Sequence, residues 1–294
     1  MTLAFDQRDG WIWFNGQLVP WKDAKLHVLS HGLHYASSVF EGERAYGGVI
    51  FKSTEHSERF RRSAEILDFE IPYSVAELDA AKALVVEKNG NPDVYVRPVA
   101  WRGSEMMAVA AQSATINVAI AVWPWPSMFD MAEKMKGIRL DIAEYRRPDP
   151  KTAPSSSKAA GLYMICTISK HAAERKGYAD AMMLDWQGRV AECTGANIFF
   201  TRDGALHTPI ADCFLDGITR RTVIDLAKRR GFDVVERRIM PDELSTFNEC
   251  FICGTGAEVT PVSEIGSHMF RPGNISRTLV EDYAAEVQPR KAAA

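Results

Sequence analysis

The chain has 294 residues, of which 46% are hydrophobic and 25% charged, and its formal net charge is -3. This length fits about two globular domains, and the charge gives no electrostatic reason to expect a nucleic acid or an anionic membrane as partner. No stretch reaches the roughly 20 apolar residues of a membrane span, and the N-terminus lacks the basic and apolar regions of a secretory signal. We therefore expect a cytoplasmic protein.

The first part of the chain, residues 1–122, is predicted to be an α/β domain. The dipeptides Asn15-Gly16 and Gly47-Gly48 separate short apolar runs and predict two hairpins. Ser74, three residues before Glu77, is typical of a capping box at the start of a helix. Further helices and strands are expected at 56–67, 75–90, 94–103 and 114–123.

A proline-rich segment, WPWPSM, follows the last of these strands and predicts an interdomain linker over 123–135, because proline cannot continue a ladder or a helix. The second domain, 136–294, mixes short strands with helices. Its clearest helices are expected at 162–177 and 217–231, each ended by a glycine. One strand is expected over 190–200, as the second arm of a hairpin. The chain is thus predicted to be an α+β protein.

Two residues of the second part stand in unusual surroundings. Lys158 lies in a Ser- and Pro-rich loop just before a helix, where a lysine is commonly solvated. Glu192 lies in an apolar strand, where a buried carboxylate needs a cationic partner or a chemical role. Taken alone, it is more commonly an edge-strand glutamate that faces water.

Besides Lys158 and Glu192, the chain has several groups that could donate hydrogen bonds to a phosphate. Gly217 precedes a helix whose first turn holds Thr219, and such helix N-termini suit phosphate. Thr255 stands between two glycines after a strand, where a backbone can approach a ligand closely. Arg59 could add a charge-assisted contact, or could be an exposed helix arginine. An amine, a carboxylate and phosphate donors are together what pyridoxal 5'-phosphate (PLP) requires of a protein.

The five cysteines do not form a secreted-type disulfide framework, since their number is odd. Cys250 and Cys253 form a CxxC, but a zinc site would need a second pair of ligands nearby. We expect two core cysteines and no metal.

The order of several motifs resembles the class IV PLP enzymes, which include branched-chain aminotransferases, D-amino-acid and (R)-amine transaminases, and aminodeoxychorismate lyase. The motifs are HYASSVFEGERAY, EHSERFRRSA, YVRP, KAAGLY, AECTGANIFF, DGITR and GTGAEVTPV. Arg44 after VFEG, together with Tyr95 to Pro98, makes the branched-chain aminotransferases the most similar subfamily. The resemblance implies PLP fold type IV, with a smaller N-terminal α/β domain and a larger C-terminal pseudo-barrel domain.

The resemblance also implies a role for each matched residue. Lys158 would be the Schiff-base lysine and proton shuttle, Glu192 would pair with the pyridine nitrogen, and Tyr163 would bind the phenolic oxygen. The phosphate would be held by Arg59, Ile218, Thr219 and Thr255. The substrate would contact Phe40, Gly42, Tyr95, Arg97, Thr255, Gly256 and Ala257. Tyr35 would reach the neighbouring subunit of a homodimer or larger homo-oligomer.

The expected reaction is ping-pong transfer of an amino group from a branched-chain L-amino acid to 2-oxoglutarate. Arg97, on an apolar strand, needs an anionic partner, which the side chain of glutamate would supply. Three features depart from the subfamily pattern: Met128 in place of a tyrosine, Glu43 in place of an apolar residue, and the Arg102 to Met107 loop with Glu105. An (R)-amine or D-amino-acid transaminase, a lyase of aminodeoxychorismate type and a non-catalytic paralogue therefore stay open.

Overall fold

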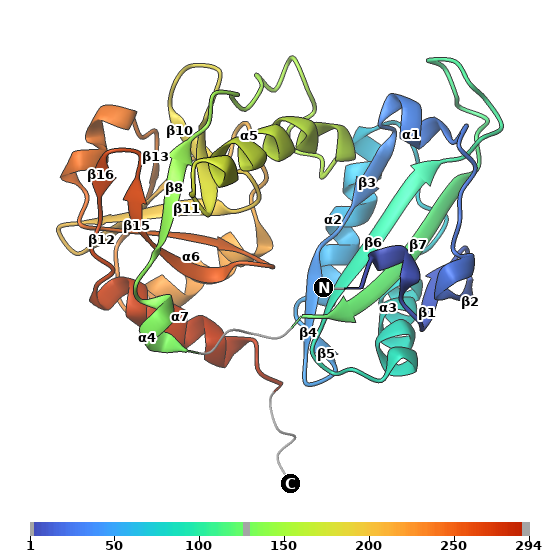
Figure 1. Ribbon diagram of the computed structural model, residues 1–294, viewed down its shortest axis with the longest axis horizontal. Helices are drawn as coiled ribbons and strands as arrows, with labels where there is room; N and C mark the ends of the chain where they lie inside the picture. Colours follow the sequence, from blue (N-terminus) through green and yellow to red (C-terminus); the bar gives the residue numbers. More distant parts are fainter. Residues whose placement is uncertain (1–2, 126–129, 290–294) are drawn as a thin grey trace, which may run out of the picture. The chain divides into compact units, whose positions relative to one another are not determined.

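The computed structural model describes residues 3–125 and 130–289 (Figure 1). The chain forms two compact units. Of the described residues, 3–125, 157–161 and 289 belong to the first unit, and 130–156 and 162–288 to the second. No sequence pattern indicated that 157–161 leaves the second unit. The predicted linker at 123–135 stays a prediction, and Met128 lies outside the described residues.

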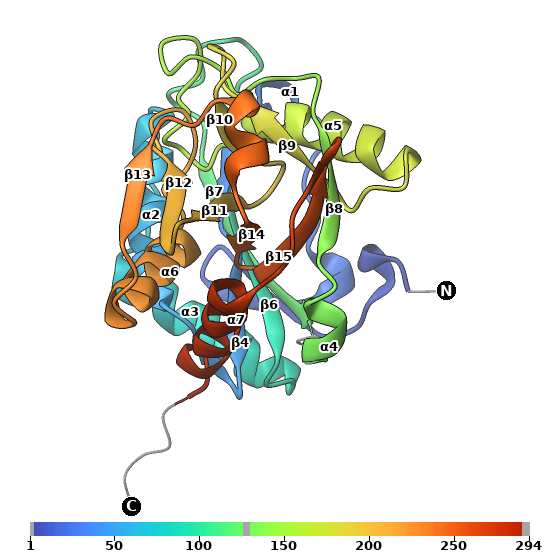
Figure 2. The same ribbon diagram turned by 90° about the vertical axis from the view of Figure 1, so that its left-hand side faces the viewer.

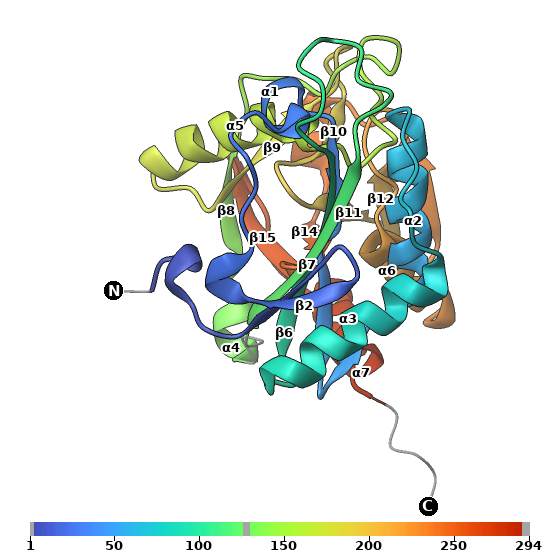
Figure 3. The same ribbon diagram turned by 90° about the vertical axis from the view of Figure 1, so that its right-hand side faces the viewer.

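The first unit is built on a seven-stranded antiparallel sheet with the order β2-β1-β7-β6-β4-β5, in which β3 also pairs with β6 (Figure 1). Figure 3 shows β2, β6 and β7 of this sheet together with α3. Helix α3 packs against α2 and against strands β1, β6 and β7. The bounds are β1 Trp11–Phe14, β2 Gln17–Pro20, β3 Ser38–Phe40, β4 Glu43–Tyr46, β5 Val49–Ile50, β6 Val94–Arg102, β7 Ile116–Pro124, α1 His31–Tyr35, α2 Ser53–Ile66 and α3 Val75–Asn89, with 3-10 turns at Phe5–Gln7 and Trp21–Asp23.

Local sequence signals of the first unit are confirmed. Asn15 and Gly16 both have positive φ, 47° and 95°, as a type I′ hairpin turn requires. Ser74 and Glu77 form the predicted capping box at the start of α3. Phe60 and Val85 from the helices meet Val96 and Ile120 of the sheet in one apolar core. Apolar burial of this kind is the main source of stability for the unit.

The second unit contains a nine-stranded sheet that curls into a half-barrel, with the order β10-β9-β8-β15-β14-β11-β12-β13 and β16 beside β15 (Figure 2). Only the pairs β8–β9, β8–β15 and β12–β13 are parallel among the described strands. The bounds are β8 Ile138–Ile142, β9 Asp180–Leu184, β10 Val190–Cys193, β11 Asn197–Arg202, β12 Ala205–Pro209, β13 Val234–Arg237, β14 Glu249–Gly254, β15 Glu258–Ile265, β16 His268–Met269, α4 Met131–Lys134, α5 Tyr163–Arg175, α6 Ile218–Arg229 and α7 Asn274–Glu286, with 3-10 turns at Ala160–Leu162 and Pro241–Thr246.

The single strand expected over 190–200 is wrong. A turn at 194–196 divides it into β10, which pairs with β9, and β11, which pairs with β12 and β14. The Cys193 N–H donates to the Ala196 carbonyl at 2.7 Å, and the Thr194 hydroxyl donates to Asp180 at 2.5 Å. The backbone bond satisfies two groups that a continuous strand would have placed in the ladder, and the side-chain bond connects the turn to the start of β9.

The expected fold class, an α/β unit followed by a half-barrel unit, agrees with this architecture. Cys250 and Cys253 are both buried on β14, in the core. Within the described ranges there is no cluster of three or more metal-ligating side chains, and none of the helices there has the length and apolar character of a membrane span.

Glu43, one of the departures noted above, is part of a buried ion pair in the first unit. Its Oε2 accepts a hydrogen bond from Lys82 Nζ at 2.9 Å, and neither side chain is exposed to solvent. Its Oε1 has no hydrogen-bond partner among the described residues. Burial raises the pKa of Glu43 to about 8, opposed by Lys82 and reinforced by the nearby Glu41. A buried pair of this kind is not expected to add stability at every pH.

The raised pKa predicts a pH-dependent loss of stability that Glu43→Gln removes. The folded protein holds the Glu43 proton more tightly than the unfolded chain does. Protonated Glu43 therefore stabilises the fold fully below about pH 4.5, and this contribution is lost as the pH rises through about 8. Across that window the unfolding free energy of wild type should fall relative to that of E43Q, by up to about 1.4 kcal/mol per pH unit. Denaturant unfolding at several pH values measures it. The exposed Glu65→Gln should follow wild type, and parallel profiles for E43Q and wild type would contradict the assignment.

Candidate active site

Lys158 is held by the first unit through its backbone. Its N–H donates to the Ser63 hydroxyl of α2 at 3.0 Å, and its carbonyl accepts from the Phe40 N–H at 3.2 Å. The Ser157 hydroxyl donates to the Ser63 carbonyl at 2.8 Å, and Ala159 forms a β-bridge with Val39. Ser63 and Ser157 are both buried. These bonds join residues 157–161 to the first unit.

The side chain of Lys158 lies beside an aromatic cluster. Its Nζ is 4.9 Å from the centre of the Phe40 ring, and Arg97 Cζ is 4.7 Å from the same centre. Arg97 also lies against Tyr95 and Trp123, and its Nη2 donates to the Tyr95 hydroxyl at 3.2 Å. The Tyr95 ring stacks on Trp123 at 5.0 Å. One cation is thus enclosed by aromatic walls, an arrangement that cation–π attraction stabilises.

Gly42 is required by this packing. A Cβ at position 42 would lie 2.0 Å from the Tyr95 hydroxyl oxygen, far inside contact distance. Gly42 is buried between β3 and β4, so Tyr95 lies over bare backbone. The neighbouring Arg44 is buried and donates to the Trp125 carbonyl at 2.8 Å.

Arg59 is buried rather than an exposed helix residue. Its Nε and Nη2 donate to the two carboxylate oxygens of Glu41, each at 2.7 Å, and His56 Nδ1 lies 2.7 Å from the same carboxylate. Burial alone would raise the pKa of Glu41, but Arg59 and His56 hold it well below its usual range. Arg59 is therefore a cation of fixed orientation, and its role as a phosphate ligand stays a prediction.

The loop that departs from the subfamily pattern is braced from inside the first unit. Arg102 Nη1 donates to the Ala111 carbonyl at 2.9 Å, and its Nη2 donates to the Asp68 carbonyl. Glu105 accepts from the Thr115 N–H at 3.1 Å. His31 Nε2 lies 2.8 Å from the Ala108 carbonyl. The two charged departures, Arg102 and Glu105, thus hold the loop itself.

In the second unit, Glu192 lies on β10 with its side chain only 13% exposed. Its Oε1 is 3.4 Å from Arg147 Nε, and its Oε2 accepts from Asn197 Nδ2 at 3.4 Å. Burial works against the charge of Arg147, but Glu192 raises the pKa of Arg147 above its usual value. The cationic partner expected for Glu192 is therefore Arg147, which the sequence analysis did not single out. Its position beside Arg146 in a loop carried no distinguishing signal.

The N-terminus of α6 fits a phosphate group. Gly217 is its N-cap, no side chain caps it, and Ile218 and Thr219 are buried in its first turn. The first N–H groups of a helix have no acceptor within the helix and carry the positive end of its dipole. A Cβ on Gly217 would lie 2.3 Å from Asn197 Oδ1. The loop therefore takes a compact path that only glycine permits.

Thr255, Gly256 and Ala257 form the turn that joins β14 to β15. The next residue, Glu258, is buried with a φ of 54° and pairs with Lys134 at 3.2 Å. A groove of about 400 Å³ is lined by Ala257, by the 194–196 turn and by Tyr163 at the start of α5. Of the residues expected to bind cofactor and substrate, Tyr163 and Ala257 thus line this groove of the second unit.

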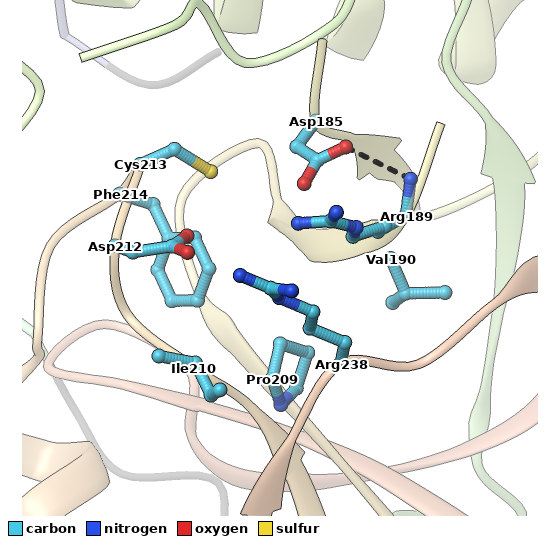
Figure 4. Close-up of a pocket in the computed structure, with 9 residues that line it drawn as sticks. All are labelled: Asp185, Arg189, Val190, Pro209, Ile210, Asp212, Cys213, Phe214 and Arg238. Carbon is cyan, nitrogen blue, oxygen red and sulfur yellow. Dashed lines mark hydrogen bonds between the residues drawn. The ribbon is translucent and has the colours of Figure 1, made fainter. Parts of the chain in front are cut away.

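A smaller pocket beside the loop before α6 is no candidate for substrate (Figure 4). Its volume is about 10 Å³, room for about one water molecule. Asp185 on its wall accepts backbone bonds from Gln187 and Arg189 at 2.8 and 2.9 Å, so it holds its own turn. The lining residues are Asp185, Arg189, Val190, Pro209, Ile210, Asp212, Cys213, Phe214 and Arg238.

The predicted residues therefore fall into two sets. The first unit brings together Lys158, Phe40, Gly42, Tyr95 and Arg97, with Arg59 on α2. The second unit carries Glu192, Tyr163, Ile218, Thr219, Thr255, Gly256 and Ala257. A carboxylate with a cationic partner, an uncapped helix N-terminus and threonine hydroxyls fit the ring nitrogen and phosphate of PLP. Tyr35 ends α1, is 45% exposed and has its ring stacked on His31.

Residues 38–265 match the Amino-transferase class IV family, which is well over half of the chain. The chain belongs to the class IV aminotransferase family.

The relatives of the chain include branched-chain amino acid aminotransferases. The chain is 43% identical over 293 residues to the probable branched-chain-amino-acid aminotransferase of Rickettsia bellii (strain RML369-C), covering 98% of this chain and 100% of the relative. The T.th. branched-chain amino acid aminotransferase with pyridoxamine 5'-phosphate is 38% identical, with a TM-score of 0.93 over 96% of this chain and 95% of that one. The same enzyme complexed with N-(5'-phosphopyridoxyl)-L-glutamate is 38% identical, with a TM-score of 0.91 over 95% and 94%.

The contact between Gly42 and Tyr95 predicts that Gly42→Ala destabilises the first unit and lowers activity. The new methyl group would displace the Tyr95 ring, and overpacking of this kind costs about 1–3 kcal/mol. Thermal unfolding and turnover measure the two effects. The double variant G42A/Y95F lacks the oxygen that the methyl group meets, so it should recover part of the lost stability. Equal unfolding temperatures for G42A and wild type would contradict the close contact.

Proposed function

We propose that this chain is a PLP-dependent transaminase that moves an amino group from a branched-chain L-amino acid to 2-oxoglutarate. The observation that carries the proposal is the position of Phe40, whose ring centre lies 4.9 Å from Lys158 Nζ and 4.7 Å from Arg97 Cζ. The amine of Lys158 and the guanidinium of Arg97 thus both lie beside the Phe40 ring.

This arrangement suits both substrates. The rings of Phe40, Tyr95 and Trp123 offer apolar walls to an aliphatic side chain. The guanidinium of Arg97 offers the γ-carboxylate of glutamate or 2-oxoglutarate a charge-assisted partner. Arg97 Nε is buried without a hydrogen-bond partner among the described residues, so the group has donor capacity left. The T.th. relative with a phosphopyridoxyl-L-glutamate adduct supports glutamate as one partner.

The roles of the protein groups follow from their positions. When bound, PLP supplies an aldehyde that takes up the amino group and a ring that delocalises the electrons left at Cα. Lys158 would carry the proton between the substrate Cα and C4′ of the cofactor. Glu192, backed by Arg147, would hold the proton on the ring nitrogen. The N–H groups of Ile218 and Thr219, with Arg59 and Thr255, would hold the phosphate.

A homodimer is part of this proposal. Large apolar side chains are exposed on and around α1 and on the loop after β6, and they would be covered by a second copy of the chain. They are Leu26, Val28, Leu29, Leu33, Tyr35, Met107 and Val109. Tyr35 would then reach the site of the neighbouring subunit. The cytoplasmic location expected from the sequence stays a prediction.

Turnover by purified protein tests the proposed reaction. With PLP, L-leucine and 2-oxoglutarate, wild type should form glutamate, and Lys158→Ala should form none and lose the visible absorption band of the bound cofactor. Lys151→Ala, an exposed lysine of the same loop, should behave as wild type. Faster turnover of D-alanine or (R)-1-phenylethylamine would instead indicate a transaminase of opposite stereochemistry. Release of pyruvate from aminodeoxychorismate without a keto acid would indicate a lyase, and a fully active K158A would refute the lysine assignment.

The dual use of the pocket predicts a split in substrate affinity for Arg97→Met. Without the guanidinium, the γ-carboxylate loses a charge-assisted partner, so the KM for 2-oxoglutarate should rise about 10- to 100-fold. The KM for L-leucine should change little, because its side chain needs only the apolar walls. The exposed Arg62→Met serves as control. An equal rise in both KM values would count against Arg97 as the carboxylate partner.

A further inference from the structure

Asn197 forms hydrogen bonds to two parts of the second unit that are distant from each other in the sequence. It begins β11 and is 6% exposed. Its Nδ2 donates to Glu192 Oε2 at 3.4 Å and to the Leu215 carbonyl at 3.1 Å. Both protons of one amide are therefore used, one toward the carboxylate of β10 and one toward the loop that leads into α6.

The backbone of Asn197 is fixed on both sides. The 194–196 turn, closed by the bond from Cys193 to Ala196, returns the chain so that Asn197 and Glu192 lie close together. Asn197 is also paired with Cys253 of β14 in the centre of the sheet. Its amide therefore projects from a rigid position, and the groups it binds take their places relative to the sheet.

Gly217 is independent evidence that this contact is built into the loop. Its φ is -65°, a conformation open to any residue, so glycine is not needed there for backbone freedom. What excludes a side chain is the Oδ1 of Asn197, which a Cβ would approach to 2.3 Å. The N-cap of α6 thus lies directly against the Asn197 amide.

We propose that Asn197 is a positioning residue that sets the distance between the Glu192 carboxylate and the N-terminus of α6. The inference rests on the proposed function, in which these groups hold the ring nitrogen and the phosphate at opposite ends of one PLP molecule. A rigid cofactor binds best when both ends are held at the matching spacing. One amide that bonds to both supports supplies that spacing before the cofactor arrives.

The test compares Asn197→Ala and Asn197→Asp with wild type by titrating the apoprotein with PLP and recording its absorption spectrum. Loss of a hydrogen bond to a charged group should weaken PLP binding about 10- to 100-fold in N197A. N197D keeps the size of the side chain but places a carboxylate against Glu192 and the Leu215 carbonyl, so binding should weaken at least as much. In both variants the visible band of the bound cofactor should shift, because Glu192 loses the hydrogen bond that Asn197 donates to it. Asn248→Ala, an exposed asparagine of the same unit, is the matched control.

Three outcomes are distinguishable. A space-filling role alone would leave N197D with the PLP affinity and spectrum of wild type, and that result would overturn the inference. Wild type that binds no PLP would refute the proposed function itself. Should the Asn197 variants fail to fold, Gly217→Ala disturbs the same contact from the other side. It should weaken PLP binding and speed amide hydrogen exchange over 215–219 in the apoprotein, and unchanged exchange there would also overturn the inference.

Discussion

The hydrogen bonds of Ser63 to the Ser157–Lys158 segment are the interaction on which the expected site depends. Ser63 accepts the Lys158 N–H through its hydroxyl and the Ser157 hydroxyl through its carbonyl. Arg59 lies four residues earlier on the same helix, so α2 presents both residues on one face. The expected Schiff-base amine and one expected phosphate ligand are therefore fixed relative to each other by one rigid element.

Charged side chains are buried at several places in the chain, which costs desolvation free energy. A partner of opposite charge beside each of them offsets part of this cost. Glu41 fixes Arg59, Arg147 accompanies Glu192, and Lys82 accompanies Glu43. The side chains of each pair lose their hydration when they are buried, and their mutual contact fixes their orientation. Glu41 and Glu43 frame Gly42, the bare position under Tyr95. The segment from Glu41 to Glu43 is thus held by the partners of its two carboxyl groups, and the Tyr95 ring packs on the glycine between them.

Much of the fold could be predicted because its signals are local. The turn at Asn15-Gly16 and the cap at Ser74 depend on neighbouring residues alone, and the order of motifs indicated the family. What escaped prediction depends on contacts distant in sequence. Arg147 pairs with Glu192 from a loop far earlier in the chain, and Glu41 turns Arg59 inward. The break at 194–196 was hidden because apolar residues continue on both sides of the turn. The spacing of residues along the sequence does not indicate such contacts.

The path of residues 157–161 also bears on how such a protein can arise and be rearranged. The chain leaves the second unit for this short segment, delivers the lysine to the first, and returns. A gene fragment that encodes residues 1–125 therefore encodes the Ser63 support without Lys158, and a fragment that begins at residue 130 encodes Lys158 without that support. The two units are compact, but neither corresponds to one continuous stretch of the gene.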